Sequence, residues 1–158
     1  MDKCVTIERA TAATETICAL VGELEADLAS HYPAEQRHGL AVDALFQPHI
    51  RFFIVTWDSV PAGCGGIALA DGFAEVKRMY VRPAFRVRGI ADTVVARLAA
   101  EAAANGLPVL RLETGTMQAA ALRFYGRMGF TPCAAFEPYA SMSAEAIAVS
   151  LFYEKRIA

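Results

Sequence analysis

The segment from Val81 to Ala91 holds the residues whose types and spacing most clearly suggest chemistry. It joins an apolar run to an Ala-rich stretch that predicts a helix, and a glycine, Gly89, stands at the junction. Glycine allows a ligand to approach the backbone closely. The first amides of a helix lack intrahelical partners, and with the positive end of the helix dipole they form an anion site. Because Arg86 and Arg88 add positive charge, the segment predicts a site for a pyrophosphate.

A second group of residues lies downstream, at spacings that match a known family motif. It consists of Leu112-Glu-Thr-Gly115, then Gln118, Ala121, Phe124 and Tyr125 at helical spacing, then the pair Gly129-Phe130. Together with Arg86-x-x-Gly89-x-Ala91, this group resembles the GNAT superfamily of acyl-CoA-dependent N-acyltransferases. The resemblance is specific from about Phe73 to Phe130. Two residues depart from the family pattern: Val87 stands where many members have Gly, and Gln118 stands where Asn is common.

The resemblance implies a site for acetyl-CoA, the expected cosubstrate. Its expected residues are Met79, Val81, Arg86, Val87, Arg88, Gly89, Ile90, Ala91 and Gln118. In the family, backbone groups at the positions of Met79 and Val81 hydrogen-bond the pantetheine arm as an added strand would. In the family, the same strand typically bulges and frees an amide that stabilises the carbonyl oxygen, although no residue pattern in this sequence indicates a bulge. The side chain of Gln118 would cap the helix or reach the pantetheine.

Five of the fifteen basic residues gather around this site. They are Lys77, Arg78, Arg82, Arg86 and Arg88. No acidic residue interrupts them, and they end where the predicted helix begins. We therefore expect them to form a collar for the phosphates of coenzyme A rather than a solvated surface.

Three residues have side chains suited to acyl transfer from a thioester to an amine. Tyr125 matches the general acid of the family, since a phenol with a pKa of about 10 can protonate a departing thiolate where the site assists it. Glu75 resembles the carboxylate with which many members deprotonate the amine, and Glu113 on the neighbouring strand is its rival. Either glutamate could instead face solvent or pair with Lys77 or Arg111, and Tyr125 could be a core aromatic residue. The sequence does not indicate which of the two glutamates deprotonates the amine.

The order of predicted elements places these residues on one sheet. Apolar runs and turn residues predict strands at 5–10, 51–57, 62–69, 73–81, 109–114, 131–136 and 148–155. Helical periodicity predicts helices from a Thr14 cap to about Leu28, at 89–105 and at 118–128, with a short one near 40–46. Because a helix joins strands 73–81 and 109–114, these strands should run parallel, with ligands at their carboxyl ends. The resemblance implies a mixed α/β fold: a central, twisted, mostly antiparallel sheet with one splayed parallel strand pair, flanked by helices.

One glycine-rich run could be mistaken for a nucleotide site. Gly63-Cys-Gly-Gly-Ile-Ala68 matches the G-x-G-x-x-A pattern of dinucleotide-binding proteins. That pattern requires a strand before it and a helix after it, whereas a turn and another strand follow here. We interpret these glycines as a bulged or closely approached strand, which disfavours a Rossmann oxidoreductase.

Length and composition exclude several functional classes. The chain has 158 residues, which predicts a single domain over residues 1–158. Its net charge of −2 offers nucleic acid no overall attraction.

The sequence has no apolar run of membrane-helix length, and its charged N-terminus is unlike a signal peptide, so we expect a cytoplasmic protein. The four cysteines and three histidines show no metal-ligand spacing, so no metal is expected. The oligomeric state stays open, a homodimer included.

The predicted function is transfer of an acetyl group from acetyl-CoA to a primary amine of a small molecule. In the family, two segments set the acceptor, here 31–49 and 136–147, in which Tyr32, Phe46 and Tyr139 could wall a pocket. Two alternatives keep the same fold: a non-catalytic module that binds or senses acyl-CoA, and an acetyltransferase for protein amines. A nucleic-acid-binding domain that uses the basic collar is disfavoured by the overall acidity.

Overall fold

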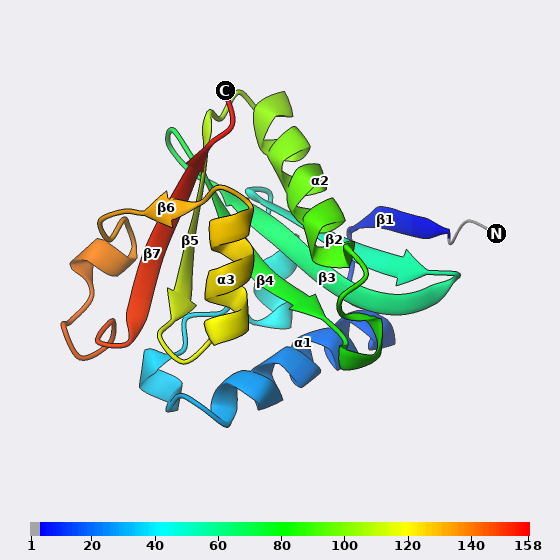
Figure 1. Ribbon diagram of the computed structural model, residues 1–158, viewed down its shortest axis with the longest axis horizontal. Coiled ribbons are helices and arrows are strands. Elements are labelled where there is room, and N and C mark those ends of the chain that lie inside the picture. The colour runs from blue at the N-terminus through cyan, green and yellow to red at the C-terminus, as the bar shows by residue number, and fades with distance from the viewer. Residues whose placement is uncertain (1–3) are drawn as a thin grey trace.

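The computed structural model describes residues 4–158 and has a seven-stranded sheet at its centre (Figure 1). The strands are β1 (Val5–Ala10), β2 (Ile50–Trp57), β3 (Val60–Leu69), β4 (Ala74–Val81), β5 (Val109–Gly115), β6 (Thr131–Pro132) and β7 (Ser150–Arg156). The helices are α1 (Glu15–Ala29), α2 (Ile90–Ala104) and α3 (Ala119–Arg127), with short 3-10 helices η1 (Ala34–Gln36), η2 (Val42–Phe46), η3 (Pro83–Phe85) and η4 (Tyr139–Ser141). The strand order is β1-β2-β3-β4-β5-β7-β6. The predicted mixed α/β architecture is confirmed.

The centre of the sheet contains the parallel pair. Every other neighbouring pair is antiparallel, and β4 and β5 pair only through Ala74 with Leu110 and Glu75 with Arg111. Both strands continue well beyond these residues, so their carboxyl halves diverge, as predicted. Figure 1 shows α3 in front of the gap that this divergence opens.

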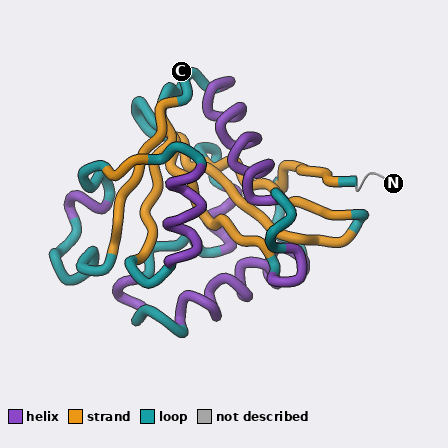
Figure 2. Tube along the Cα trace, in the orientation of Figure 1, coloured by secondary structure: helices purple, strands orange, loops and turns teal. Residues whose placement is uncertain are grey.

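Helices pack on both faces of the sheet, as the tube in Figure 2 illustrates. Successive side chains of a strand point to opposite faces, so Phe53 of β2 packs with residues of α2 and its neighbour Phe52 packs with residues of α1. The buried residues of α1 are Ile17, Leu20, Val21 and Leu24, and those of α2 include Ile90, Val94 and Leu98. Among the helices of residues 4–158, none is both long enough and apolar enough to cross a bilayer.

Local signals in the sequence fix where the helices begin. The hydroxyl of Thr14 accepts a hydrogen bond from the amide of Ile17 at 3.2 Å and so caps α1, as predicted. Gly89 precedes α2 with a φ of +75°, a conformation that glycine adopts without a steric penalty. The chain can therefore turn sharply from the 81–89 loop into α2.

A bulge interrupts β4 where this strand passes β3. Lys77 pairs with Gly66 and Tyr80 pairs with Cys64, so β4 has one more residue than β3 between these two pairs. The extra residue turns the chain at Arg78, whose φ is +55°. The bulge that the family resemblance implied is therefore present, in the strand expected to bind pantetheine.

The glycine-rich run 63–68 lies within β3, where neighbouring backbones approach closely. A Cβ at Gly63 would lie 2.3 Å from the carbonyl oxygen of Tyr80, and one at Gly66 would lie 2.9 Å from that of Arg51. These distances are too short for a side chain. The interpretation as a closely approached strand is confirmed, and a dinucleotide-binding turn is excluded.

One predicted strand is shorter than expected. A strand was predicted at 131–136, but β6 covers Thr131–Pro132 alone. After Pro132 the chain leaves the sheet, and the ring of Phe136 packs edge-on against Phe152 and Tyr139 at centroid distances of 5.6 and 5.4 Å. Burial of this aromatic ring replaces strand pairing at the sheet edge.

Candidate active site

Two cavities meet at the gap between β4 and β5, and we call them the larger and the smaller cavity. The larger has a volume of about 690 Å³ and follows the end of β4, the 81–89 loop, the start of α2 and the face of α3. The smaller has a volume of about 140 Å³ and lies between the segment after α1, β4 and β5. Both are lined by Leu24, Met79, Gln118, Ala121 and Tyr125. A ligand that fills the larger cavity would therefore reach one in the smaller cavity at Tyr125.

The larger cavity gathers the residues predicted to bind acetyl-CoA. It is lined by Met79, Val81, Arg86, Val87, Gly89, Ile90, Ala91 and Gln118. Arg88 is the exception, because its guanidinium lies over the rings of Trp57 and Phe85, at 5.2 and 5.6 Å from their centroids. The structure thus brings the predicted set together, with Arg88 directed to an aromatic surface beside it.

The loop before α2 contains two residues with positive φ, Val87 at +61° and Gly89 at +75°. A Cβ built at Gly89 would have no heavy atom within 4 Å, so backbone conformation rather than space requires glycine in the free protein. Val87 adopts a left-handed conformation, which the glycine found at this position in many family members would favour. For an L-residue this conformation costs about 1–2 kcal/mol. Its side chain is fully exposed, so no packing contact offsets this cost.

Ion pairs neutralise three of the five cations expected to form a phosphate collar. Arg82 pairs with Glu23 at 2.8 Å, Arg78 pairs with Glu25 at 2.5 Å, and Lys77 pairs with Glu75 at 3.1 Å. Both Glu23 and Glu25 come from α1, which packs along β4. The collar prediction is therefore wrong for these three residues. The acidic partners of Arg78 and Arg82 lie far away in the sequence, whereas Lys77 pairs with the nearby Glu75, the alternative named above. Arg86 and Arg88 remain for an anionic ligand.

Tyr125 lies on α3 at the junction of the two cavities. Its side chain is only 7% exposed, and its ring packs edge-on against Phe130 at 5.4 Å. Burial raises the pKa of the Tyr125 phenol above its ordinary value. The phenol therefore stays protonated at neutral pH, and its raised pKa makes it a weaker acid than a free phenol.

Gln118 holds the turn between β5 and α3. Its Oε1 atom accepts hydrogen bonds from the backbone amide of Gly115 at 2.9 Å and from the hydroxyl of Thr114 at 3.1 Å. Gln118 stands at the N-cap of α3 but makes no side-chain cap hydrogen bond, so the capping role expected of it is wrong, and its side chain holds the preceding turn instead. Its position in the lining of both cavities keeps its amide close to any ligand at their junction.

Glu75 is buried and enclosed by hydrogen-bond donors. Its Oε2 atom lies 3.1 Å from Nζ of Lys77 and accepts a hydrogen bond from the hydroxyl of Tyr139. Lys77 also donates to the Tyr139 hydroxyl at 2.8 Å. The ion pair with Lys77, named above as a structural alternative, is thus present. Oε2 of Glu75 is therefore already engaged by a cation and a phenol.

Glu113 lies on the neighbouring strand β5 and has a different environment. Its Oε2 atom accepts a hydrogen bond from the hydroxyl of Ser150 at 2.7 Å, and among residues 4–158 it has no salt-bridge partner. Burial raises its pKa, which the Ser150 bond partly opposes. A carboxylate with a raised pKa is the better proton acceptor near neutral pH, so geometry and charge favour Glu113 over Glu75.

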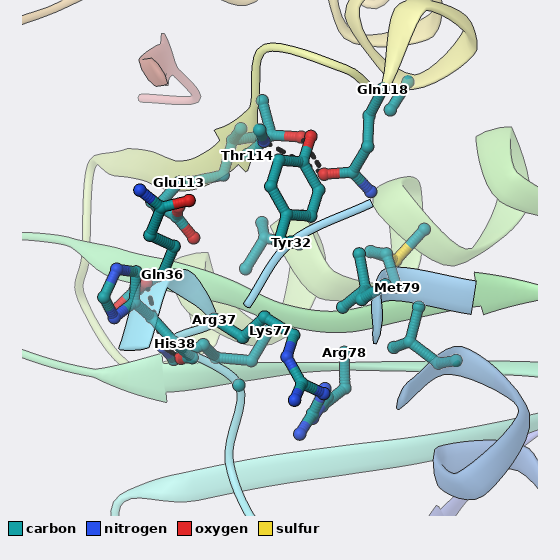
Figure 3. Close-up of a pocket in the computed structure, with 18 of the residues that line it drawn as sticks. Tyr32, Gln36, Arg37, His38, Lys77, Arg78, Met79, Glu113, Thr114 and Gln118 are labelled. Carbon is teal, nitrogen blue, oxygen red and sulfur yellow. Dashed lines mark hydrogen bonds and ion pairs between the residues drawn. The ribbon is translucent and has the colours of Figure 1, made fainter. Parts of the chain in front are cut away.

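The smaller cavity also draws on the two segments expected to set the acceptor. Tyr32 lines it, as Figure 3 shows, and accepts a hydrogen bond from the amide of Met117 at 2.9 Å. Tyr139 lines it from η4. Phe46 does not line either cavity, because it packs on the core layer beneath α1. Arg37 and His38 line the smaller cavity from an irregular segment without a motif. Sequence reasoning missed Arg37, and it gave His38 only a loop position that could lie near a substrate.

The described residues contain no group of three or more histidine, cysteine, aspartate or glutamate side chains arranged to hold a metal ion.

Comparison with known proteins agrees with this geometry. Residues 19–130 match the model of the acetyltransferase (GNAT) family. The chain is 38% identical over 153 residues to the IAA acetyltransferase of Azospirillum brasilense, covering 96% of this chain and 97% of that protein. A crystal structure from Klebsiella pneumoniae, provisionally described as an acyl-CoA N-acyltransferase, is 28% identical with a TM-score of 0.77 and 98% coverage of both chains. The PaiA N-acetyltransferase of Thermoplasma acidophilum, solved in complex with coenzyme A, has a TM-score of 0.69 at 17% identity, with 96% and 98% coverage. The chain belongs to the GNAT family of acyl-CoA-dependent N-acyltransferases.

Proposed function

We propose that this protein transfers the acetyl group of acetyl-CoA to the primary amine of a small molecule. One observation carries the proposal: the two cavities meet at Tyr125, with a carboxylate, Glu113, in the smaller one. Acyl transfer requires a donor and an acceptor to meet between an acid and a base, and this arrangement provides for both.

Acetyl-CoA would occupy the larger cavity. Its pyrophosphate would bind the first amides of α2, with Arg86 supplying a nearby cation. The pantetheine arm would run along β4 at Met79 and Val81. The coenzyme A complex of the Thermoplasma acidophilum relative, which has the same fold, supports this assignment.

The acceptor would occupy the smaller cavity. Glu113 would take a proton from the ammonium group, and the free amine nitrogen would attack the thioester carbon. An amide at the β4 bulge would stabilise the negative oxygen that forms. The carbon–sulfur bond then breaks, Tyr125 gives its proton to the sulfur, and the nitrogen loses a second proton, which restores the Tyr125 phenol. Glu113 then releases the first proton to solvent. The products are the acetylated amine and the free thiol of coenzyme A, with one proton released overall.

A thiol-release assay tests this proposal. Purified protein is supplied with acetyl-CoA and a panel of amines, with IAA, the compound in the relative's name, as a further acceptor. Steady thiol release that depends on an acceptor, together with an acetylated product of matching mass, is the expected result. Tight acetyl-CoA binding without turnover on any acceptor would contradict acetyl transfer and leave a binding module.

A further inference from the structure

One end of the smaller cavity is negative. The charges of Lys77 and Glu75 cancel each other at 3.1 Å, so this pair adds no net charge. Glu113 lines the same cavity, and its partner Ser150 is neutral. A single carboxylate charge thus remains at this end, and it favours a ligand cation such as an ammonium group.

Another part of the cavity has an excess of positive charge. Arg37 and Arg78 both line it, and both pair with the same carboxylate, Glu25, at 2.9 and 2.5 Å. Two guanidinium groups against one carboxylate leave one net positive charge. Figure 3 shows the side chains of Arg78 and Glu113 on different sides of the cavity. The cavity therefore presents separate regions of opposite charge.

The Nε atom of Arg37 is an unused donor. Among residues 4–158, it is the one buried side-chain nitrogen or oxygen that has no hydrogen-bond partner. Buried donors in folded proteins are almost always paired, with protein, water or a ligand. Nε itself has almost no accessible surface, so a carboxylate would meet Arg37 at the terminal nitrogens of its guanidinium group, and a small movement of the side chain would let Nε join in a bidentate contact.

The segment that carries Arg37 is fixed in place before any ligand binds. Nε of Arg78 donates to the carbonyl of Leu40 at 2.9 Å, and Nζ of Lys77 donates to the carbonyl of His38 at 3.3 Å. Gly39 lies directly on the Arg78 guanidinium, where a Cβ would come within 2.1 Å of its central carbon. Arg37 is thus held at the cavity by β4, which reduces the entropy lost on binding.

From these contacts we infer that the acceptor is a primary amine that also bears a carboxylate, such as an amino acid. Its carboxylate would bind Arg37, and its amino group would lie toward Glu113, next to the thioester. The cavity volume of about 140 Å³ is small against the 300–1,000 Å³ typical of drug-sized ligands, which suits such a short acceptor. This inference rests on the proposed function and narrows its acceptor.

The test compares acceptors that differ only in the carboxylate. Thiol release from acetyl-CoA is measured with each of the twenty L-amino acids, with their amides and with the corresponding decarboxylated amines, for instance leucine, leucinamide and 3-methylbutylamine. We expect the best amino acid to exceed its amide and amine by about tenfold or more in kcat/KM, which corresponds to one charge-assisted hydrogen bond. Most of the difference should lie in KM.

Variants of Arg37 control for differences in basicity among the acceptors, because the basicity of an acceptor does not depend on the enzyme form that is assayed. Arg37→Gln should lose about tenfold or more on the amino acid and little on the amide, and Arg37→Lys should lie between. Glu25→Gln keeps Arg37 and removes its competing carboxylate, so the preference for the amino acid should persist or increase. Arg97→Gln removes an arginine of α2 that lines neither cavity, and it should leave the ratio unchanged.

A binding measurement serves as a readout independent of turnover. The N-acetyl form of the best amino acid should bind wild type more tightly than its amide does in calorimetry, and Arg37→Gln should abolish the difference. The inference is overturned if amides or amines are accepted as well as amino acids, or if Arg37→Gln keeps the preference, in which case water satisfies Nε. In those cases acetyl transfer itself stands. Failure of every acceptor would overturn the proposed function and this inference with it.

Discussion

The two cavities that meet at Tyr125 are built in different ways. One continuous segment, residues 79–92, gives the larger one a bulged strand, a loop with a left-handed glycine and the first turn of α2, and residues of α1 and α3 complete its lining. The smaller one is formed by side chains from segments that are far apart in the chain, including α1, residues 36–39, β4, β5 and η4. Backbone geometry suits a ligand part that is the same in every reaction. Side chains brought together from many segments suit a part that differs between proteins.

The largest expected effect concerns the junction of the two cavities. Tyr125→Phe should lower kcat by about 10²–10⁴-fold and leave acetyl-CoA affinity almost unchanged, because the phenol acts only as the thiolate leaves. The ring contact with Phe130 is retained, so the fold should persist. Single-turnover kinetics and calorimetry with acetyl-CoA measure the two quantities. A variant that turns over at the wild-type rate while chemistry is limiting would make Tyr125 a core aromatic residue.

The next effect should separate the two glutamates of the smaller cavity. Glu113→Gln should reduce kcat/KM by about 10²-fold or more near neutral pH, and the loss should shrink at high pH, where the amine loses its proton unaided. A base must be deprotonated, so the wild-type rate should rise with pH through the pKa of Glu113, which burial places above the ordinary value. Glu113→Gln should lack this rise.

Glu75→Gln is the matched comparison for that experiment. It removes the charge that Lys77 neutralises and disturbs the Tyr139 hydroxyl, so we expect higher KM and a loss that does not depend on pH. Should Glu75→Gln abolish the pH dependence while Glu113→Gln keeps it, the two assignments must be exchanged. Rates are measured from about pH 5 to 10 with saturating acetyl-CoA.

A smaller effect should appear in the larger cavity. Gly89→Val forces a β-branched residue to a φ of +75°, so it should cost about 1–2 kcal/mol of stability and weaken acetyl-CoA binding by about tenfold. Gly106→Val is the control, because Gly106 also has a φ of +75° and no heavy atom within 4 Å of a built Cβ, but lines neither cavity. Denaturant melts and calorimetry should show equal destabilisation and unequal affinity. Equal affinities would remove Gly89 from the ligand site.

The contrast between the two cavities also explains which features could be predicted from the sequence. The strands, the parallel pair and the 81–91 loop follow from local periodicity and turn residues. The end of β4, this loop and the start of α2 line one cavity because they are consecutive in the chain. The neutralisation of Arg78 and Arg82 could not be predicted, because Glu25 and Glu23 lie more than fifty residues earlier and meet them only when α1 packs on β4. Long-range ion pairs depend on tertiary packing, which has no local signal.

The acceptor side shows this limit most clearly. Tyr32 and Tyr139 were expected near a pocket because they lie in the two segments that set the acceptor in the family, yet nothing in their spacing indicated that Tyr139 would hold Glu75. Arg37 and His38 lie in an irregular segment whose conformation β4 side chains determine. A choice between Glu75 and Glu113 required these contacts, since the two glutamates lie on neighbouring strands, with Glu113 only two residues beyond the partner of Glu75.

The smallest expected effect concerns Val87, where the larger cavity departs from its family pattern. Val87→Gly removes the penalty of a positive φ but gives the unfolded chain more freedom, so the net gain in stability should be below about 1 kcal/mol, or a few degrees in Tm. Ser59→Gly relieves a φ of +69° in the β2–β3 turn, away from both cavities, and should give a similar gain. Only Val87→Gly should also change acetyl-CoA affinity, because glycine lets the loop follow the pyrophosphate more closely. Thermal melts with and without acetyl-CoA measure both effects. If the two variants respond to acetyl-CoA alike, the loop does not contact the ligand at residue 87, and the larger cavity depends on Gly89 and the first turn of α2.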